Sequence, residues 1–101
     1  MKEYDSAVIK KSILQEKSDR MSGVEFVESD DWTEVSECGT QSKVYIFRDV
    51  TSKKTYAVVD YREWNEVEGN YTYFSDDWEG NIECPEVKKK KALKKEWVVI
   101  R

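Results

Sequence analysis

The chain of 101 residues contains no histidine, and this absence removes several kinds of catalytic chemistry. Histidine is the commonest general base, the usual partner of serine and cysteine nucleophiles, and a frequent zinc ligand. The two cysteines, Cys38 and Cys84, lack the C-x-x-C spacing and cannot form a structural zinc site alone. Only four glycines are present, and they form no glycine-rich phosphate loop. We therefore expect a protein that is not an enzyme and has no catalytic residue, metal site or cofactor.

Long apolar segments are missing as well. No apolar run approaches the roughly 20 residues that a transmembrane helix needs, so we expect no membrane contact. The first residues, Met1–Asp5, lack the basic-then-apolar order of a signal peptide. These features predict a cytoplasmic protein, in whose reducing surroundings Cys38 and Cys84 remain free thiols.

Charge is abundant but unevenly distributed. The net charge is −4, yet residues 87–101 contain seven basic residues and one acidic residue. Two long segments, Ser22–Ser42 and Glu63–Val87, contain many acidic residues and no basic residue. Such a distribution predicts a dipolar molecule, which bears on its choice of partners.

A β-hairpin is predicted over about residues 43–61. Two runs of β-branched and aromatic residues, Val44–Phe47 and Thr55–Val59, suit a pleated, half-buried surface. They flank the short polar segment Asp49–Lys54, which has the composition of a turn. Because both faces of the first arm carry apolar side chains, this pair of strands belongs in the centre of a sheet.

An N-terminal helix and several short strands are predicted around this hairpin. The helix covers residues 6–21, begins at a capping Asp5 or Ser6 and ends at Gly23, although its first apolar residues also fit a strand. The predicted short strands are Val24–Glu28, Trp32–Ser36, Asn70–Phe74 and Ile82–Cys84.

The basic segment over residues 87–101 completes the predicted fold. Its apolar residues share one parity, so we expect a strand with lysines on its solvent face, with a short helix over 88–95 as the alternative. The fold class is then α+β, mostly β, in a single domain. It consists of an antiparallel sheet of five or six strands built on the central hairpin, with one N-terminal helix, an acidic meander over 24–84 and this basic strand.

One tetrapeptide occurs on each side of the hairpin. Ser29-Asp30-Asp31-Trp32 recurs as Ser75-Asp76-Asp77-Trp78, and a Glu-Cys pair and a glycine recur in the same register. The match predicts two similar strand–turn–strand corners. Compositional coincidence in so acidic a chain is the alternative.

The four aspartates of this repeat allow two structural interpretations. In the favoured one, their side chains accept backbone N–H groups in a turn while the tryptophan anchors the corner in the core. In the other, the paired carboxylates hold a divalent cation, although the ligand spacing of a calcium loop is missing. A carboxylate-based enzyme would also have to use Asp30, Asp31, Asp76 and Asp77.

Acidic and aromatic residues together predict a surface that binds another protein. Aromatic side chains within a charged rim have the composition of binding hot spots. A partner protein that normally binds nucleic acid would offer the matching basic face, so partial DNA mimicry is one form of this hypothesis. The alternative is a small-ligand module for a nucleotide or an ion. The predicted binding residues are Asp30, Asp31, Trp32, Trp64, Tyr71, Tyr73, Asp76, Asp77 and Trp78.

Four consecutive lysines form a basic patch near the C-terminus. They are Lys88, Lys89, Lys90 and Lys91. Such a run guards an exposed sheet edge, and in so acidic a chain we expect no direct binding of nucleic acid. In the small-ligand alternative these lysines would hold a phosphate. We also expect a weak homodimer in which the basic strand of one copy meets the acidic segment 63–87 of another, with a self-neutralised monomer as the alternative.

The order of several motifs resembles small accessory proteins of tailed bacteriophages. These motifs are Trp32 with Val35, Val44 with Tyr45 and Phe47, Tyr56 with Val58, Gly69 with Tyr71, and Lys95 with Trp97 and Val98. The resemblance covers about residues 30–100 and carries no site residues with it. It implies a virus-made protein in the host cytosol that inhibits or redirects a host enzyme or defence system.

Overall fold

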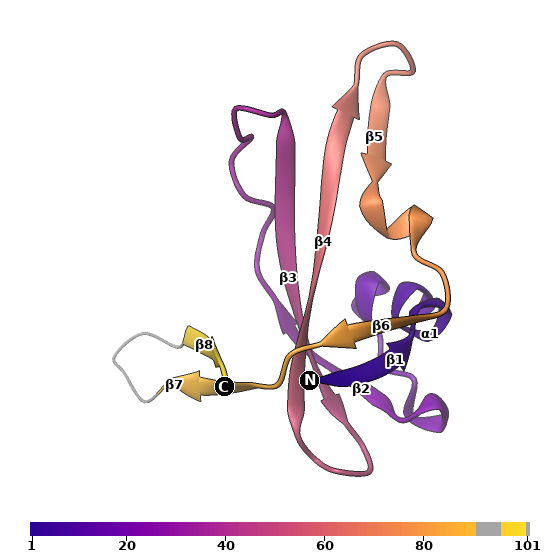
Figure 1. The fold of residues 1–101 in the computed structure, drawn as a ribbon, viewed down its shortest axis with the longest axis vertical. Helices are drawn as coiled ribbons and strands as arrows, with labels where there is room; N and C mark the ends of the chain where they lie inside the picture. The colour runs from indigo at the N-terminus through magenta and orange to yellow at the C-terminus, as the bar shows by residue number, and fades with distance from the viewer. Residues whose placement is uncertain (91–95, 101) are drawn as a thin grey trace.

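The largest unit of the computed structural model, which describes residues 1–90 and 96–100, is a four-stranded antiparallel sheet. Its strand order is β2-β3-β4-β5, and β3 and β4 run the whole length of the molecule (Figure 1). The four strands are β2 (Val24–Ser29), β3 (Thr40–Asp49), β4 (Thr55–Asn65) and β5 (Asn70–Tyr73).

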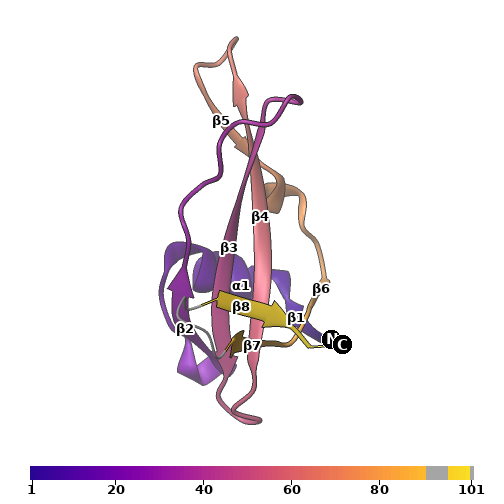
Figure 2. The ribbon, with the colours of Figure 1, turned by 90° about the vertical axis from the view of Figure 1, so that its left-hand side faces the viewer.

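Two smaller antiparallel sheets flank this one on opposite faces (Figures 1 and 2). On one face β1 (Lys2–Asp5) pairs with β6 (Asn81–Cys84), next to helix α1 (Ser6–Lys11). On the other face β7 (Val87–Lys90) forms a hairpin with β8 (Glu96–Val99). Three single 3₁₀ turns complete the described part of the chain: η1 (Ile13–Gln15), η2 (Arg20–Ser22) and η3 (Phe74–Asp77).

The central hairpin is confirmed. The register joins Tyr45 to Val58 on one face and Ile46 to Ala57 on the other, so the apolar side chains of both arms alternate between two cores. Both strands are flanked by another strand, as their two apolar faces predicted. In the turn between β4 and β5, Gly69 adopts a positive φ of 69° that suits glycine.

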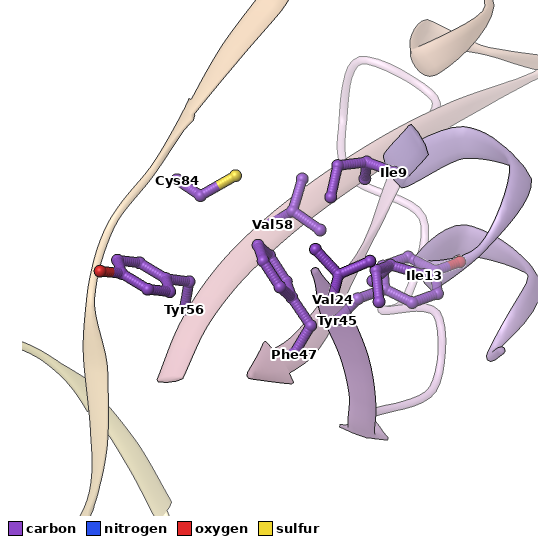
Figure 3. Packing of buried hydrophobic residues seen from close by; sticks show 8 residues of the cluster. All are labelled: Ile9, Ile13, Val24, Tyr45, Phe47, Tyr56, Val58 and Cys84. Carbon is purple, nitrogen blue, oxygen red and sulfur yellow. The ribbon is translucent and has the colours of Figure 1, made fainter. Parts of the chain in front are cut away.

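The larger core lies between the sheet and the layer formed by α1, η1, β1 and β6 (Figure 3). Phe47, Ile9, Ile13, Val24 and Cys84 are completely buried there. The helix contributes Ile9 and η1 contributes Ile13, since residues four apart lie on one side of a helical segment.

The smaller core explains the place of the C-terminal hairpin. Val87 and Trp97 pack on Ile46, Ala57 and Val44, which form the opposite face of the central strands. The indole N–H of Trp97 also donates a hydrogen bond to the Glu28 carboxylate of β2. The hairpin therefore covers the apolar face that the N-terminal layer leaves free.

Several expectations about the secondary structure are wrong. The largest sheet has four strands, because β1, β6, β7 and β8 pair outside it. The helix predicted over 6–21 ends at Lys11, where the Ser12 hydroxyl turns back to the Val8 carbonyl at 2.5 Å and Glu16 takes a positive φ of 57°. The segment before it forms strand β1 and was not predicted.

The C-terminal region also differs from the prediction. The single strand over 87–101 is replaced by two strands, in which Val87 lies opposite Val99. Residues 88–90 are extended, as favoured. The alternative prediction was a helix over 88–95. Its remaining positions, residues 91–95, lie outside the described residues.

The strand predicted over Trp32–Ser36 is absent from the structure. Residues 30–36 instead run beside β3: the N–H groups of Asp30, Thr33 and Ser36 donate to β3 carbonyls, while side-chain oxygens take the place of backbone acceptors. Asp30 Oδ1 accepts the Val44 N–H at 2.8 Å, and Thr33 Oγ1 accepts the Ser42 N–H at 3.0 Å. The segment therefore remains beside the sheet without a regular ladder.

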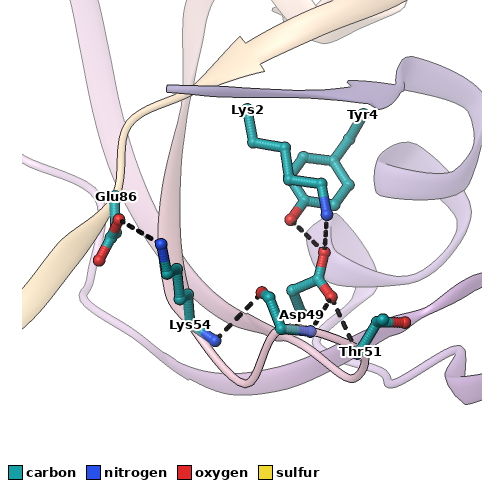
Figure 4. A network of polar contacts seen from close by, with 7 residues as sticks. Lys2, Tyr4, Asp49, Thr51, Lys54 and Glu86 are labelled. Carbon is teal, nitrogen blue, oxygen red and sulfur yellow. Dashed lines mark hydrogen bonds and ion pairs between the residues drawn. The ribbon is translucent and has the colours of Figure 1, made fainter.

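Asp49 ties the N-terminus to the β3–β4 turn (Figure 4). Its buried carboxylate accepts hydrogen bonds from the Lys2 ammonium, the Tyr4 hydroxyl at 2.7 Å, and the N–H groups of Thr51 and Ser52 at 2.9 and 3.0 Å. Burial alone would raise the pKa of this carboxyl. The four donors outweigh that effect and hold the pKa well below its usual range.

We predict that Asp49→Asn lowers the free energy of unfolding at pH 7 by about 2 kcal/mol, because Lys2 and Tyr4 lose a charged acceptor. A carboxyl with a depressed folded-state pKa stabilises above its unfolded value and loses that contribution as the pH falls below it. The difference in stability between the two proteins should therefore begin to shrink below about pH 4 and continue to shrink as the pH falls further. Urea unfolding over a pH series measures this, with the exposed Asp77→Asn as control. A constant difference down to pH 2 would contradict the ionic role.

The two cysteines should differ sharply in reactivity. Both are free, as predicted, but Cys38 is exposed and Cys84 is fully buried, and burial raises the pKa of the Cys84 thiol to about 12. Only the thiolate is nucleophilic, so iodoacetamide at pH 8 should label Cys38 alone in the folded protein and both thiols in urea. Mass spectrometry of the peptides decides it. Equal labelling of both thiols without urea would show that the larger core opens readily.

Candidate functional site

The upper part of the sheet in Figure 1 extends beyond both cores and carries most of the predicted binding residues. We call this part the distal ribbon; it comprises residues 30–43 and 60–73, and the second range includes the turn between β4 and β5. Figure 2 shows its upper end standing clear of both α1 and the β7–β8 hairpin. The lower halves of β3 and β4 are thus covered by the two cores, and their upper halves extend from these cores as the exposed distal ribbon.

Four aromatic side chains on one face of the distal ribbon form a continuous row. Trp32 lies edge-on to Tyr73 at 5.8 Å between ring centroids, Tyr73 lies 6.4 Å from Tyr71, and Tyr71 lies edge-on to Trp64 at 5.0 Å. Tyr71 lies directly opposite Trp64 in the ladder. These four residues, the aromatic row, were all predicted to bind, and the structure brings them together.

Arg62 lies within the aromatic row. Its guanidinium carbon is 4.2 Å from the Trp32 ring centroid and 3.9 Å from that of Tyr71, and its Nε donates to Gln41 Oε1 at 2.9 Å. Sequence reasoning missed this residue. The signal was available, since Arg62 is the only basic residue between Lys54 and Lys88 and shares a strand face with Trp64.

The fifth predicted aromatic residue lies elsewhere. Trp78 packs half-buried against the larger core, and its carbonyl accepts a hydrogen bond from the Lys10 ammonium at 3.0 Å. Nor do the two Ser-Asp-Asp-Trp segments form similar corners. The first is the end of β2 followed by irregular extended chain, whereas the second lies in η3. The predicted structural repeat is therefore wrong.

The segments that carry the aromatic row, and η3 next to them, also carry exposed carboxylates. In the described residues none of these exposed acids takes part in an ion pair, whereas six acids elsewhere in that part of the chain pair with lysine or arginine. Asp30 is used structurally, as an acceptor for Val44. The exposed, unpaired acids are Asp31, Glu34, Glu37, Glu63, Glu66, Glu68, Asp76 and Asp77.

Lys88 and Lys89 of the basic patch lie on the sheet face opposite the aromatic row. Lys88 is exposed on β7, and the Lys89 ammonium is 3.8 Å from a Glu28 carboxylate oxygen and 5.4 Å from the Trp97 ring centroid. The side chains of Lys90 and Lys91 lie outside the described part. The predicted pairing between this patch and the acids of a second copy stays a prediction.

Two other features of the described chain bear on function. Across residues 1–90 and 96–100, no three histidine, cysteine, aspartate or glutamate side chains gather as ligands for a metal ion. Over the same residues, the helices are all too short or too polar to cross a bilayer.

Comparisons with known proteins add no relative: no family model, curated protein or solved structure matches this chain. The resemblance to phage accessory proteins therefore stays a prediction.

We predict that Arg62→Ala lowers the free energy of unfolding by about 1–2 kcal/mol, because two ring contacts are lost at a partly exposed site. The free energy of unfolding of Arg62→Lys should lie between those of Arg62→Ala and the unchanged protein, since an ammonium cannot stack flat between two rings. Glu63→Ala, one residue along and facing the other side, serves as the matched control. Urea unfolding followed by tryptophan fluorescence measures all three. Equal stabilities for Arg62→Ala and the control would mean that the guanidinium does not hold the row together.

Proposed function

We propose that this chain is a non-enzymatic binding protein whose distal ribbon engages a basic face of a partner protein. The observation that supports this most is the set of exposed carboxylates around the aromatic row, none of which is paired within the described residues. Charges left without partners in the free protein are available to meet opposite charges on another molecule.

The two kinds of residue contribute differently to such an interface. Tryptophan, tyrosine and arginine supply most of the binding free energy at hot spots, and Trp64 and Tyr71 are 49% and 38% exposed. The exposed, unpaired acids named above, which we call the acidic rim, accelerate the encounter with a basic protein surface and repel acidic surfaces. Since Tyr71 contacts both Trp64 and Arg62, the anchors are already arranged before a partner arrives.

The kind of partner follows from charge and from the resemblance stated above. A protein that binds nucleic acid offers an extended basic face, so the acidic ribbon would compete for it and act as an inhibitor or modulator. A phage origin would make that partner a host protein, such as a nucleic-acid-binding or defence enzyme. The small-ligand alternative, in which Lys88–Lys91 hold a phosphate, gains no support within one chain from the described residues, because Lys88 and Lys89 lie on the sheet face opposite the aromatic row.

We predict that the purified protein captures a specific basic protein from bacterial lysate, and captures less of it at 500 mM than at 50 mM salt, because screening weakens the acidic rim. Trp64→Ala should weaken the captured complex about tenfold or more, as hot-spot truncations do. Tyr61→Ala, which removes an aromatic side chain from the opposite face of the same strand, should leave affinity within about twofold.

Calorimetry or surface plasmon resonance with the identified partner measures these affinities. Recovery of no specific protein at either salt concentration would count against the proposal. An equal loss of affinity for Trp64→Ala and Tyr61→Ala would place the interface away from the aromatic row.

A further inference from the structure

A cavity of about 380 Å³ lies where the aromatic row meets the N-terminal layer. One side is formed by the aromatic residues Trp32 and Tyr73, and another by the end of α1 and by η1. Its volume lies within the range of small-ligand pockets. The lining residues are Lys10, Leu14, Gln15, Trp32, Lys43, Tyr45, Asp60, Tyr73, Ser75 and Asp76.

Asp60 is the unusual member of this lining. It is only 3% exposed, yet within the described residues it forms no ion pair. Its Oδ1 accepts the N–H groups of Tyr61 and Ser75 at 2.8 and 3.0 Å, while Oδ2 accepts the Ser75 hydroxyl at 2.8 Å and no other donor of the described residues. A carboxylate has about four acceptor positions, so Oδ2 can take another donor.

The surroundings of Asp60 disfavour its charge. Burial raises the pKa of this carboxyl above its usual value, and the neighbouring Asp76 carboxylate raises it further. The hydrogen bonds from Ser75 and Tyr61 offset only part of this effect. A cation in the cavity would therefore relieve a cost that the free protein carries.

The two lysines of the lining do not supply that cation. Lys43 lies directly opposite Asp60 in the β3–β4 register, but its ammonium points to Glu16 at 3.4 Å and lies 5.2 Å from the Tyr45 ring centroid. Lys10 donates to the Trp78 carbonyl. Both ammonium groups already have partners outside the Asp60 carboxylate.

We infer that this cavity receives an arginine side chain of the partner protein, with the guanidinium against Trp32 and Tyr73 and a hydrogen bond to Asp60. This inference rests on the proposed function, because it names the residue type that anchors the basic partner. Guanidinium is weakly hydrated, stacks on aromatic rings and donates along its edge. Trp32 already makes this kind of contact with Arg62.

A pair of small probes tests the inference without any partner. N-acetyl-arginine amide carries the guanidinium, and N-acetyl-citrulline amide has nearly the same shape without the charge. Titration of the ¹⁵N-labelled protein with the arginine probe should shift the Trp32 indole and Ser75 amide signals, while the citrulline probe should leave them in place. Equal shifts with both probes, or none with either at 50 mM, would overturn the inference.

Variants assign the response to the cavity. Asp60→Asn and Asp76→Asn should each weaken the arginine probe about fivefold or more, because each removes a negative charge beside the guanidinium. Asp77→Asn is the matched control, an exposed aspartate of η3 that does not line the cavity. If Asp60→Asn does not fold by circular dichroism, Asp76→Asn and Trp32→Phe carry the test. Unchanged binding in the folded variants would overturn the inference.

The same variants separate this inference from the proposed function. A captured partner whose affinity survives Asp60→Asn and Asp76→Asn, but falls with Trp64→Ala, supports the distal ribbon and rejects the arginine anchor. Binding of the arginine probe without capture of any protein from lysate supports the cavity and rejects the proposed partner class.

Discussion

The pairing of β3 with β4 is the interaction on which the other parts of this structure depend. Nine residue pairs run from Thr40 opposite Glu63 to Arg48 opposite Thr55, so the two strands act as one long twisted unit. Their lower half is buried on both faces, by the N-terminal layer and by the C-terminal hairpin. Their upper half is held by this pairing, by β5 and residues 30–36, and at its base by contacts of Asp60 with Ser75 and of Lys43 with Glu16. Removing the lower cores would leave the distal ribbon with too little buried apolar surface to remain ordered.

How far the sequence predicts this fold depends on how local each signal is. The hairpin was predictable because period-2 alternation and a polar turn are contained within about 20 residues. The end of α1 at Lys11 was not, since it depends on a hydroxyl of Ser12 that returns to the preceding turn. The four-residue strand β1 exists because β6, nearly eighty residues later, pairs with it. The repeated tetrapeptide folds in two ways, because Ser75 is drawn to buried Asp60 while Ser29 lies at the end of an edge strand.

In the candidate site, too, the residues with a local sequence signal were predictable and those that depend on strand register were not. The four aromatic residues were predictable from the composition of their segments. The β4–β5 ladder brings Trp64, Tyr71 and Tyr73 onto one face, where Trp32 contacts Tyr73. Arg62 and Asp60 were not predicted, because a single charge in a strand is ordinarily a solvated residue. Their roles come from register: Arg62 lies opposite Tyr73, and Asp60 opposite Lys43. Trp78 ends the second copy of the tetrapeptide, whose backbone conformation differs from that of the first copy. Its side chain therefore packs against the larger core and not in the aromatic row.

The position of Arg62 bears on why an exposed row of rings can persist in an acidic surface. Tryptophan and tyrosine that stand free on a ribbon would rotate among rotamers, and ordering them on binding would cost affinity. The guanidinium contacts both Trp32 and Tyr71, and Gln41 fixes its orientation from β3. It thereby ties residues 30–36, β3, β4 and β5 together where no core reaches. The same positive charge also offsets part of the repulsion among the surrounding carboxylates. A single residue thus stabilises the ribbon and keeps its aromatic residues arranged for binding.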